Sequence, residues 1–163
     1  MQQTLKGVGL LLLLTTGILC FTSFQTSPNE TIISYTVDPK KQTVNFFWKN
    51  DTGEVLKSLQ NLKSYVESKH AELIFATNGG MFDSDLSPHG LFIQDQVKHA
   101  ELDTTSGQGN FYLKPNGVFY LTANNTPVVC KTEEFQNNNL IKYATQSGPM
   151  LVIDGEIHSV FKK

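Results

Sequence analysis

Apolar residues follow different patterns along this chain, and each pattern predicts a different kind of element. The first run, residues 8–21, is mostly apolar, about 14 residues long, and preceded by Lys6. It is shorter than the roughly 20 residues that span a bilayer. A positive residue before such a run is typical of an export signal, so residues 1–25 are predicted to be a signal peptide. The alternatives are a short uncleaved N-terminal anchor and lipidation at Cys20.

The period of the pattern then changes twice. Residues 31–37 and 42–49 are rich in β-branched and aromatic residues and flank the turn-forming residues 38–41, which predicts strand, turn, strand. Over residues 54–69 the apolar positions recur at helical spacing. We predict a helix there, capped by Asp51 or Thr52, with an apolar stripe that packs on a sheet.

Short strands are predicted for most of the remaining chain. Residues 73–77 form an apolar run typical of a buried strand. Hairpins are predicted across Asp95-Gln96, across Pro115-Asn116-Gly117 and across Asp154-Gly155. The second of these joins residues 110–114 to 118–122. Many short strands with one main helix indicate an α+β fold whose sheet is mixed and mostly antiparallel.

Charge and cysteine content narrow the choice of partners. Thirteen basic and 15 acidic residues give a net charge of −2, and none of the basic residues is arginine. The absence of a basic run argues against nucleic acid, and against a membrane surface beyond the N-terminal segment, as the main partner. After the predicted signal only Cys130 remains, so no internal disulfide is expected and Cys130 is interpreted as a small buried hydrophobe.

The residues after the predicted strand 73–77 carry the most informative local chemistry. Asn78, Gly79 and Gly80 are followed by Met81-Phe82-Asp83. Two adjacent glycines let backbone N–H groups turn toward an anion such as phosphate, although the simpler interpretation is a tight turn that only needs positive φ. Asp83 and Asp85 have a spacing used for divalent cations but also common in solvated loops. His89 could transfer a proton or simply lie on the surface, and no His-rich motif predicts a metal site.

Two polar loops, residues 106–110 and 144–149, could present amides and hydroxyls to a sugar or simply connect strands. Ser147-Gly148-Pro149 does not fit the nucleophile elbow of serine hydrolases. Neither a P-loop nor a dinucleotide-binding fingerprint is present, and the sequence specifies no cofactor.

Four ordered blocks together resemble the phosphodiester glycosidase domain family, to which the lysosomal uncovering enzyme belongs. The similarity runs from about Tyr35 to the C-terminus and is strongest to bacterial exported members. The blocks are residues 78–83 (NGGMFD), 88–91 (PHGL), 109–119 (GNFYLKPNGVF) and 144–151 (ATQSGPML).

The resemblance implies hydrolysis of a glycosidic bond whose leaving group is a phosphate-linked alcohol, in a small-molecule or glycan phosphodiester. It implies substrate or phosphate contacts, polar positioning groups and Asp83 as a candidate acid or base. A glycosidase usually needs two carboxylates across the scissile bond, and Asp85 and Asp154 are the other candidates. The implied substrate-binding residues are Asn78, Gly79, Gly80, Asn110, Gln146, Ser147 and Gly148.

The chain also departs from the family pattern, because it lacks the arginine-containing Gly-Val-Gly strand and the late Asp-Gly-Gly-Ser block. Residues 30–163 are therefore expected to form the front part of the domain, truncated at its C-terminal side. We expect an exported hydrolase of the phosphodiester glycosidase type, periplasmic, extracellular or membrane-anchored, that is inactive alone. The alternatives are a non-catalytic module that binds carbohydrate or cell-envelope glycan, and a remnant that does not fold.

Overall fold

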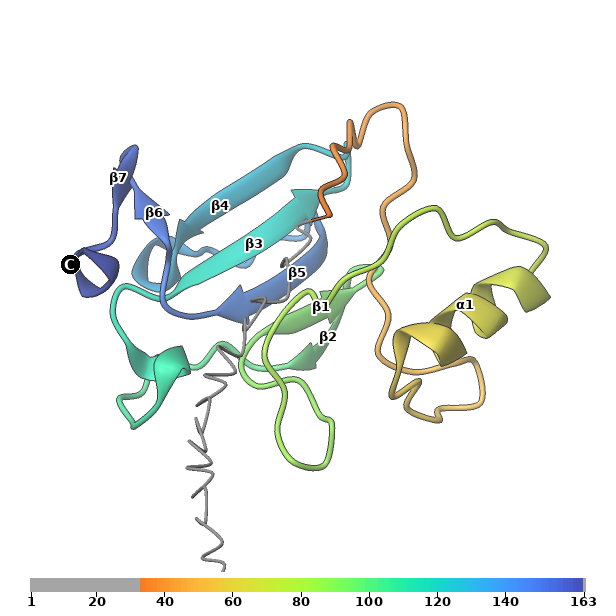
Figure 1. Ribbon diagram of the computed structural model, residues 1–163, viewed down its shortest axis with the longest axis horizontal. Helices are drawn as coiled ribbons and strands as arrows, with labels where there is room; N and C mark the ends of the chain where they lie inside the picture. The colour runs from red at the N-terminus through yellow and green to blue at the C-terminus, as the bar shows by residue number, and fades with distance from the viewer. Residues whose placement is uncertain (1–32, 163) are drawn as a thin grey trace, which may run out of the picture. The chain divides into compact units, whose positions relative to one another are not determined.

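An antiparallel sheet organises the part of the chain that the computed structural model describes, residues 33–162. The strands lie in the order β2-β1-β5-β3-β4, and every neighbouring pair is antiparallel (Figure 1). The predicted α+β class with a mostly antiparallel sheet is confirmed. The strands are β1 (Phe92–Gln94), β2 (Val97–Ala100), β3 (Gly117–Thr122), β4 (Pro127–Lys131) and β5 (Ile141–Ser147).

Smaller elements surround this sheet. The short strands β6 (Val152–Ile153) and β7 (Glu156–Ile157) form a second sheet, and α1 (Leu59–Ser68) is the α-helix of the described residues. The 3-10 turns are η1 (Asn110–Tyr112), η2 (Thr132–Glu134) and η3 (Ser159–Phe161).

The residues from Tyr35 onward form one compact unit. The predicted signal peptide, residues 1–25 with Cys20, lies outside the described residues. Between residues 33 and 162, no helix combines the length and the apolar character needed to cross a membrane.

Successive residues of a strand face opposite sides of the sheet, which gives this sheet two packed faces. On one face Ile93, Val118 and Ala144 are buried, and Leu102 and Phe135 pack against them. These apolar side chains form the main core.

The other face of the sheet is covered by aromatic rings. The ring of Phe46 stacks on those of Tyr143, Phe119 and Phe92, with centroids 5.2, 6.1 and 6.5 Å apart. Trp48 meets Phe92 edge to face. Residues near Phe46 thus form the second layer over the central strands.

This layer explains why the predicted opening strands are wrong. Residues 33–37 and 42–49 form no strand, because the second segment contributes rings to the sheet face and not backbone hydrogen bonds to a strand. The turn between them is confirmed, since the Asp38 carbonyl accepts hydrogen bonds of 2.9 Å from the amides of Lys41 and Gln42.

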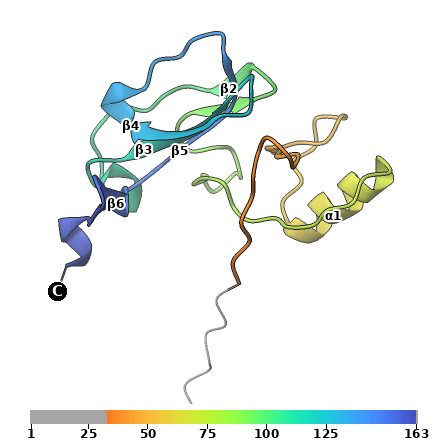
Figure 2. The ribbon, with the colours of Figure 1, turned by 90° about the horizontal axis from the view of Figure 1, so that it is seen from above.

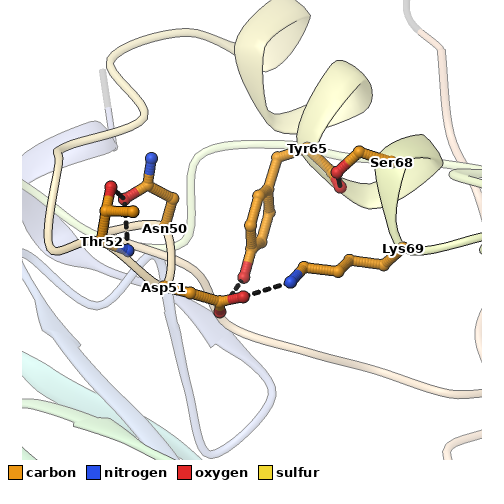
Figure 3. A network of polar contacts seen from close by, with 6 residues as sticks. All are labelled: Asn50, Asp51, Thr52, Tyr65, Ser68 and Lys69. Carbon is orange, nitrogen blue, oxygen red and sulfur yellow. Dashed lines mark hydrogen bonds and ion pairs between the residues drawn. The ribbon is translucent and has the colours of Figure 1, made fainter.

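The helix begins later than predicted. Lys57 has a φ of 66°, which is incompatible with a helix, and Ser58 caps α1 by accepting a 3.1 Å hydrogen bond from the Asn61 amide. The predicted cap residues lie in the preceding turn. There the Asn50 side chain accepts from the Thr52 amide, whereas the Asp51 carboxylate bonds Tyr65 and Lys69 of the helix end (Figure 3).

The expectation that the helix packs its apolar stripe on the sheet is also wrong. None of the residues of α1 is buried. The contacts of α1 are local: the Tyr65 ring meets Phe47 edge to face, and Asp51 bridges Tyr65 and Lys69. The helix is therefore held by exposed polar contacts to the turn before it.

The apolar run 73–77 is not a strand either. Ile74 and Phe75 keep 63% and 40% of their surface exposed, and Phe75 stacks on Tyr35 at 5.4 Å. No strand among residues 33–162 pairs with this segment, so its backbone makes none of the interstrand hydrogen bonds that define a strand. No sheet of the described residues covers its apolar side chains.

Two of the three predicted hairpins are confirmed. Asp95 and Gln96 adopt positive φ between β1 and β2, as a tight hairpin turn requires, and Asp154 and Gly155 do so between β6 and β7. The hairpin predicted across residues 115–117 is wrong. Residues 110–112 form η1, and β3 pairs with β4 and β5.

Candidate functional site

A pocket of about 400 Å³ lies where β5 ends. Ser147 ends β5 and is followed by Gly148, and Asn110 enters the pocket wall from η1. Three residues implied by the family resemblance therefore meet at one cavity, from two blocks about 37 positions apart in the chain. The complete lining is Met81, Asn110, Leu113, Ser147, Gly148, Pro149, Leu151 and Phe161.

The polar groups on this lining are neutral. The Asn110 amide and the Ser147 hydroxyl offer donors and acceptors, and the other side chains are apolar. None of the lining residues carries a formal charge. The wall combines a few polar groups with apolar area, as small-molecule sites commonly do.

Glycines allow the loops of the site to approach β5 closely. A Cβ on Gly80 would lie 2.2 Å from Oγ1 of Thr145, and one on Gly148 would lie 2.3 Å from the Phe111 carbonyl oxygen. Because Gly80 has no side chain, its loop can pack against β5. Because Gly148 has none, η1 can pack against the chain there. By contrast, a Cβ on Gly79 would meet no atom within 4 Å.

The interpretation of Gly79 and Gly80 as a turn that needs positive φ is wrong. Neither residue is among those with positive φ. Gly80 needs to lack a side chain because it packs closely against Thr145, whereas a Cβ at Gly79 would meet no atom within 4 Å. Phosphate binding by their backbone amides stays a prediction.

Gln146 is fully buried and acts as a hub between strands and loops. Its Oε1 accepts from the amides of Leu91 and Asp103 at 3.1 and 3.0 Å. Its Nε2 donates to the Asp103 carbonyl at 2.7 Å and to Oγ1 of Thr132 at 3.3 Å. The side chain is satisfied by protein partners, so its contribution to the site is to fix the surrounding segments.

Asp83 pairs with His89 across a short loop. The distance between Oδ1 of Asp83 and Nδ1 of His89 is 2.6 Å, and the two side chains are 51% and 25% exposed. The loop is closed by a bridge between Phe82 and Pro88 and by the His89 amide, which donates to the Met81 carbonyl at 2.9 Å. The dyad is therefore attached directly to a residue that lines the pocket.

Aromatic rings enclose the imidazole of His89. The ring centroids of Phe111 and Tyr112 lie 4.2 and 5.7 Å away, both edge to face. Nε2 of His89 is shielded from solvent and has no hydrogen-bond partner among the described residues.

The other carboxylates considered have local structural roles. Asp85 accepts from the amide and hydroxyl of Ser87, and the hydroxyl hydrogen bond in particular lowers the pKa of Asp85. Asp154 lies in the β6–β7 turn with positive φ. Asp103 was not predicted; its pKa is lowered chiefly by a hydrogen bond from the Thr105 hydroxyl and also by the nearby His89.

The structure thus gathers some of the predicted residues and not others. Asn110, Ser147 and Gly148 line one pocket, and Gly80 packs on β5 beside it. Asn78 and Gly79 are exposed and do not line it. Asp83 does not line the pocket. It is linked to it through its contact with His89, whose amide donates to the carbonyl of the lining residue Met81.

Sequence reasoning did not predict the partnership of His89 with Asp83 or its enclosure by Phe111 and Tyr112. All four residues lie in blocks that carry the family resemblance, so the sequence marked these segments but did not show that the side chains contact one another. The weaker signal for Asp103 is the Asp-x-Thr pattern with Thr105, which is typical of a local side-chain turn.

Other groups add little to this site. Across residues 33–162, no three His, Cys, Asp or Glu side chains gather as metal ligands would. Cys130 lies in β4, and burial raises the pKa of its thiol, which disfavours the reactive thiolate. A smaller cavity of about 220 Å³ lies by residues 39–44 and contains none of the predicted residues.

Comparison with known proteins agrees with the family resemblance. The phosphodiester glycosidase family profile matches residues 71–163. The chain belongs to the phosphodiester glycosidase family. The matched region includes the Asp83–His89 loop and every residue that lines the pocket.

A curated relative supports the same assignment over more of the chain. The uncharacterized protein YigE of Escherichia coli K12 is 34% identical over 131 residues, which cover 80% of this chain and 51% of YigE. The chain thus spans about half the length of this relative. No solved structure matches this chain.

Proposed function

We propose that this phosphodiester glycosidase family member is exported and binds a glycosyl phosphodiester in the pocket at the end of β5. The supporting observation is that Asn110, Ser147 and Gly148 share one cavity. A sugar offers hydroxyls to the amide and hydroxyl side chains, and its apolar ring face suits Leu113, Leu151 or Phe161.

Binding is tested by calorimetry with the methyl phosphodiester of N-acetylglucosamine 1-phosphate. Removing one neutral hydrogen bond costs about 0.5–1.5 kcal/mol, so Asn110→Ala and Ser147→Ala should each weaken binding roughly 2- to 13-fold. Asn139→Ala and Ser64→Ala are matched controls, since both residues are exposed and lie outside the pocket. Equal affinity in all four variants would contradict the proposed site.

We propose further that the chain alone releases little sugar. Phosphate is commonly held by cationic side chains. The pocket lining contains none. Sugar release from the probe should rise when the part of YigE that this chain does not cover is added. Rapid release by the chain alone would contradict this proposal.

The alternative function is a glycan-binding module without chemistry. The neutral lining of the pocket favours it, because uncharged side chains suffice to hold a sugar. Such a module would bind the free sugar as tightly as its phosphodiester, and Asp83→Ala would not alter binding. Tighter binding of the phosphodiester would favour the hydrolase.

A further inference from the structure

The Asp83–His89 dyad is an acid–base arrangement beside the pocket. A carboxylate that accepts a hydrogen bond from Nδ1–H of an imidazole fixes the tautomer and leaves Nε2 as the free acceptor. The 2.6 Å contact between Nδ1 of His89 and Oδ1 of Asp83 has this form. In this tautomer the proton lies on Nδ1, and the lone pair of Nε2 is the one that can accept a proton.

The environment of Nε2 is unusual for a histidine with only a structural role. The atom is shielded from solvent, yet no described residue donates a hydrogen bond to it. Buried polar atoms are nearly always paired, so an unpaired one requires an explanation such as a role in binding or catalysis. His158 provides the contrast, because both of its ring nitrogens have protein partners: the Lys114 carbonyl at 3.0 Å and the Val160 amide at 3.1 Å.

His89 contacts two segments that form the pocket wall. Its amide donates to the carbonyl of Met81, which lines the pocket. Its ring packs against Phe111, the residue that follows Asn110 in η1. The backbone segments that carry the polar wall therefore also determine where the imidazole lies.

The chemistry of the proposed substrate requires a base more than an acid. The departing group is a phosphate monoester, whose second pKa is about 6, so it leaves as an anion without prior protonation. An alcohol leaving group would need a general acid, which is why most glycosidases carry two carboxylates. One proton acceptor for the attacking water is sufficient here.

We propose that His89 is the general base of this site and that Asp83 is its positioning residue. This inference rests on the proposed function. Water adds through its oxygen to the anomeric carbon, the bond between that carbon and the phosphate oxygen breaks, and the bond's electron pair leaves with the phosphate monoester. One proton of the water passes to Nε2 of His89, and Asp83 retains its hydrogen bond to Nδ1. The products are the free sugar and the phosphate monoester.

The tautomer is tested first, by ¹⁵N NMR of the histidine side chains above their titration range. His89 should be the Nδ1–H tautomer, whereas His158, which donates from Nε2 to a carbonyl, should be the Nε2–H tautomer in the same spectrum. Asp83→Ala should remove the Nδ1–H preference of His89. Ser84→Ala, in the same loop and exposed, should preserve it. An Nε2–H tautomer for His89 in the unaltered protein would overturn the proposal.

The second measurement adds the methyl phosphodiester of N-acetylglucosamine 1-phosphate and follows the Nε2 resonance of His89 together with the amides of Asn110 and Ser147. We expect all three to shift. If the amides shift and Nε2 does not, the inference fails and the proposed binding site stands. If none shifts at saturating probe, the proposed site fails and the inference fails with it.

Discussion

At the scale of single residues, the structure separates neighbours that look equivalent in the sequence. Gly79 and Gly80 are adjacent, but only Gly80 lies where a side chain would collide with β5. Ser147 and Gln146 are also adjacent, and alternation along the strand exposes the first at the pocket and buries the second as a hub. The sequence shows that these residues belong to the family blocks. It does not show their different roles, because those depend on which glycine packs against β5 and on which face of β5 each strand residue lies.

Alanine substitutions at the two glycines should therefore differ. Gly80→Ala should lower the free energy of unfolding by about 1–3 kcal/mol, the usual effect of overpacking, because Oγ1 of Thr145 lies in the way. Gly79→Ala should have little effect on it. Denaturant unfolding measures both, and Thr145→Ala should partly rescue Gly80→Ala in the double variant. Equal losses at Gly79 and Gly80, with no rescue, would contradict this packing.

Tyr143 gives a pH-dependent prediction. Burial, together with the hydrogen bond to Asp95, raises the pKa of Tyr143. Above about pH 10, the ordinary value, the unfolded chain releases this proton while the folded chain keeps it, so stability falls as pH rises. Tyr143→Phe lacks this loss. The stability difference between the unaltered protein and Tyr143→Phe, from chemical unfolding, should shrink between pH 8 and pH 11; a constant difference would contradict it.

At the scale of elements, local signals predicted local structure. The β1–β2 and β6–β7 hairpins were predictable because their turn residues accept positive φ. The pairing of β3 with β5 joins segments some 20 residues apart and had no turn signal between them. The segment near Phe46 has strand composition but contributes rings to a sheet face, and composition alone does not separate these outcomes.

The start of α1 is tested through its cap. Ser58→Ala should remove the hydrogen bond to the Asn61 amide and destabilise the helix by about 1 kcal/mol. Because α1 buries no residue, the change should appear as faster amide hydrogen exchange within α1, with little effect on the sheet. Ser64→Ala, inside the helix and exposed, is the control. Unchanged exchange in Ser58→Ala would contradict the observed start.

At the scale of the whole molecule, the sheet contributes buried core residues and the apolar run 73–77 does not. Ile93 is 2% exposed in the core, whereas Ile74 is 63% exposed. Ile93→Ala should cost about 2–5 kcal/mol of unfolding free energy, whereas Ile74→Ala should change it by less than about 0.5 kcal/mol. Denaturant unfolding of the two variants compares the same substitution in both places. A loss at Ile74 as large as that at Ile93 would show that residues 73–77 are buried in solution.

The central claim is that the pocket at the end of β5 holds a glycosyl phosphodiester. Its most direct test is backbone amide chemical-shift mapping of the ¹⁵N-labelled chain during titration with the methyl phosphodiester of N-acetylglucosamine 1-phosphate. We predict saturable shifts that cluster at Met81, Asn110, Ser147 and Gly148. Shifts that cluster instead by residues 39–44, or an unchanged spectrum at saturating probe, would contradict the account.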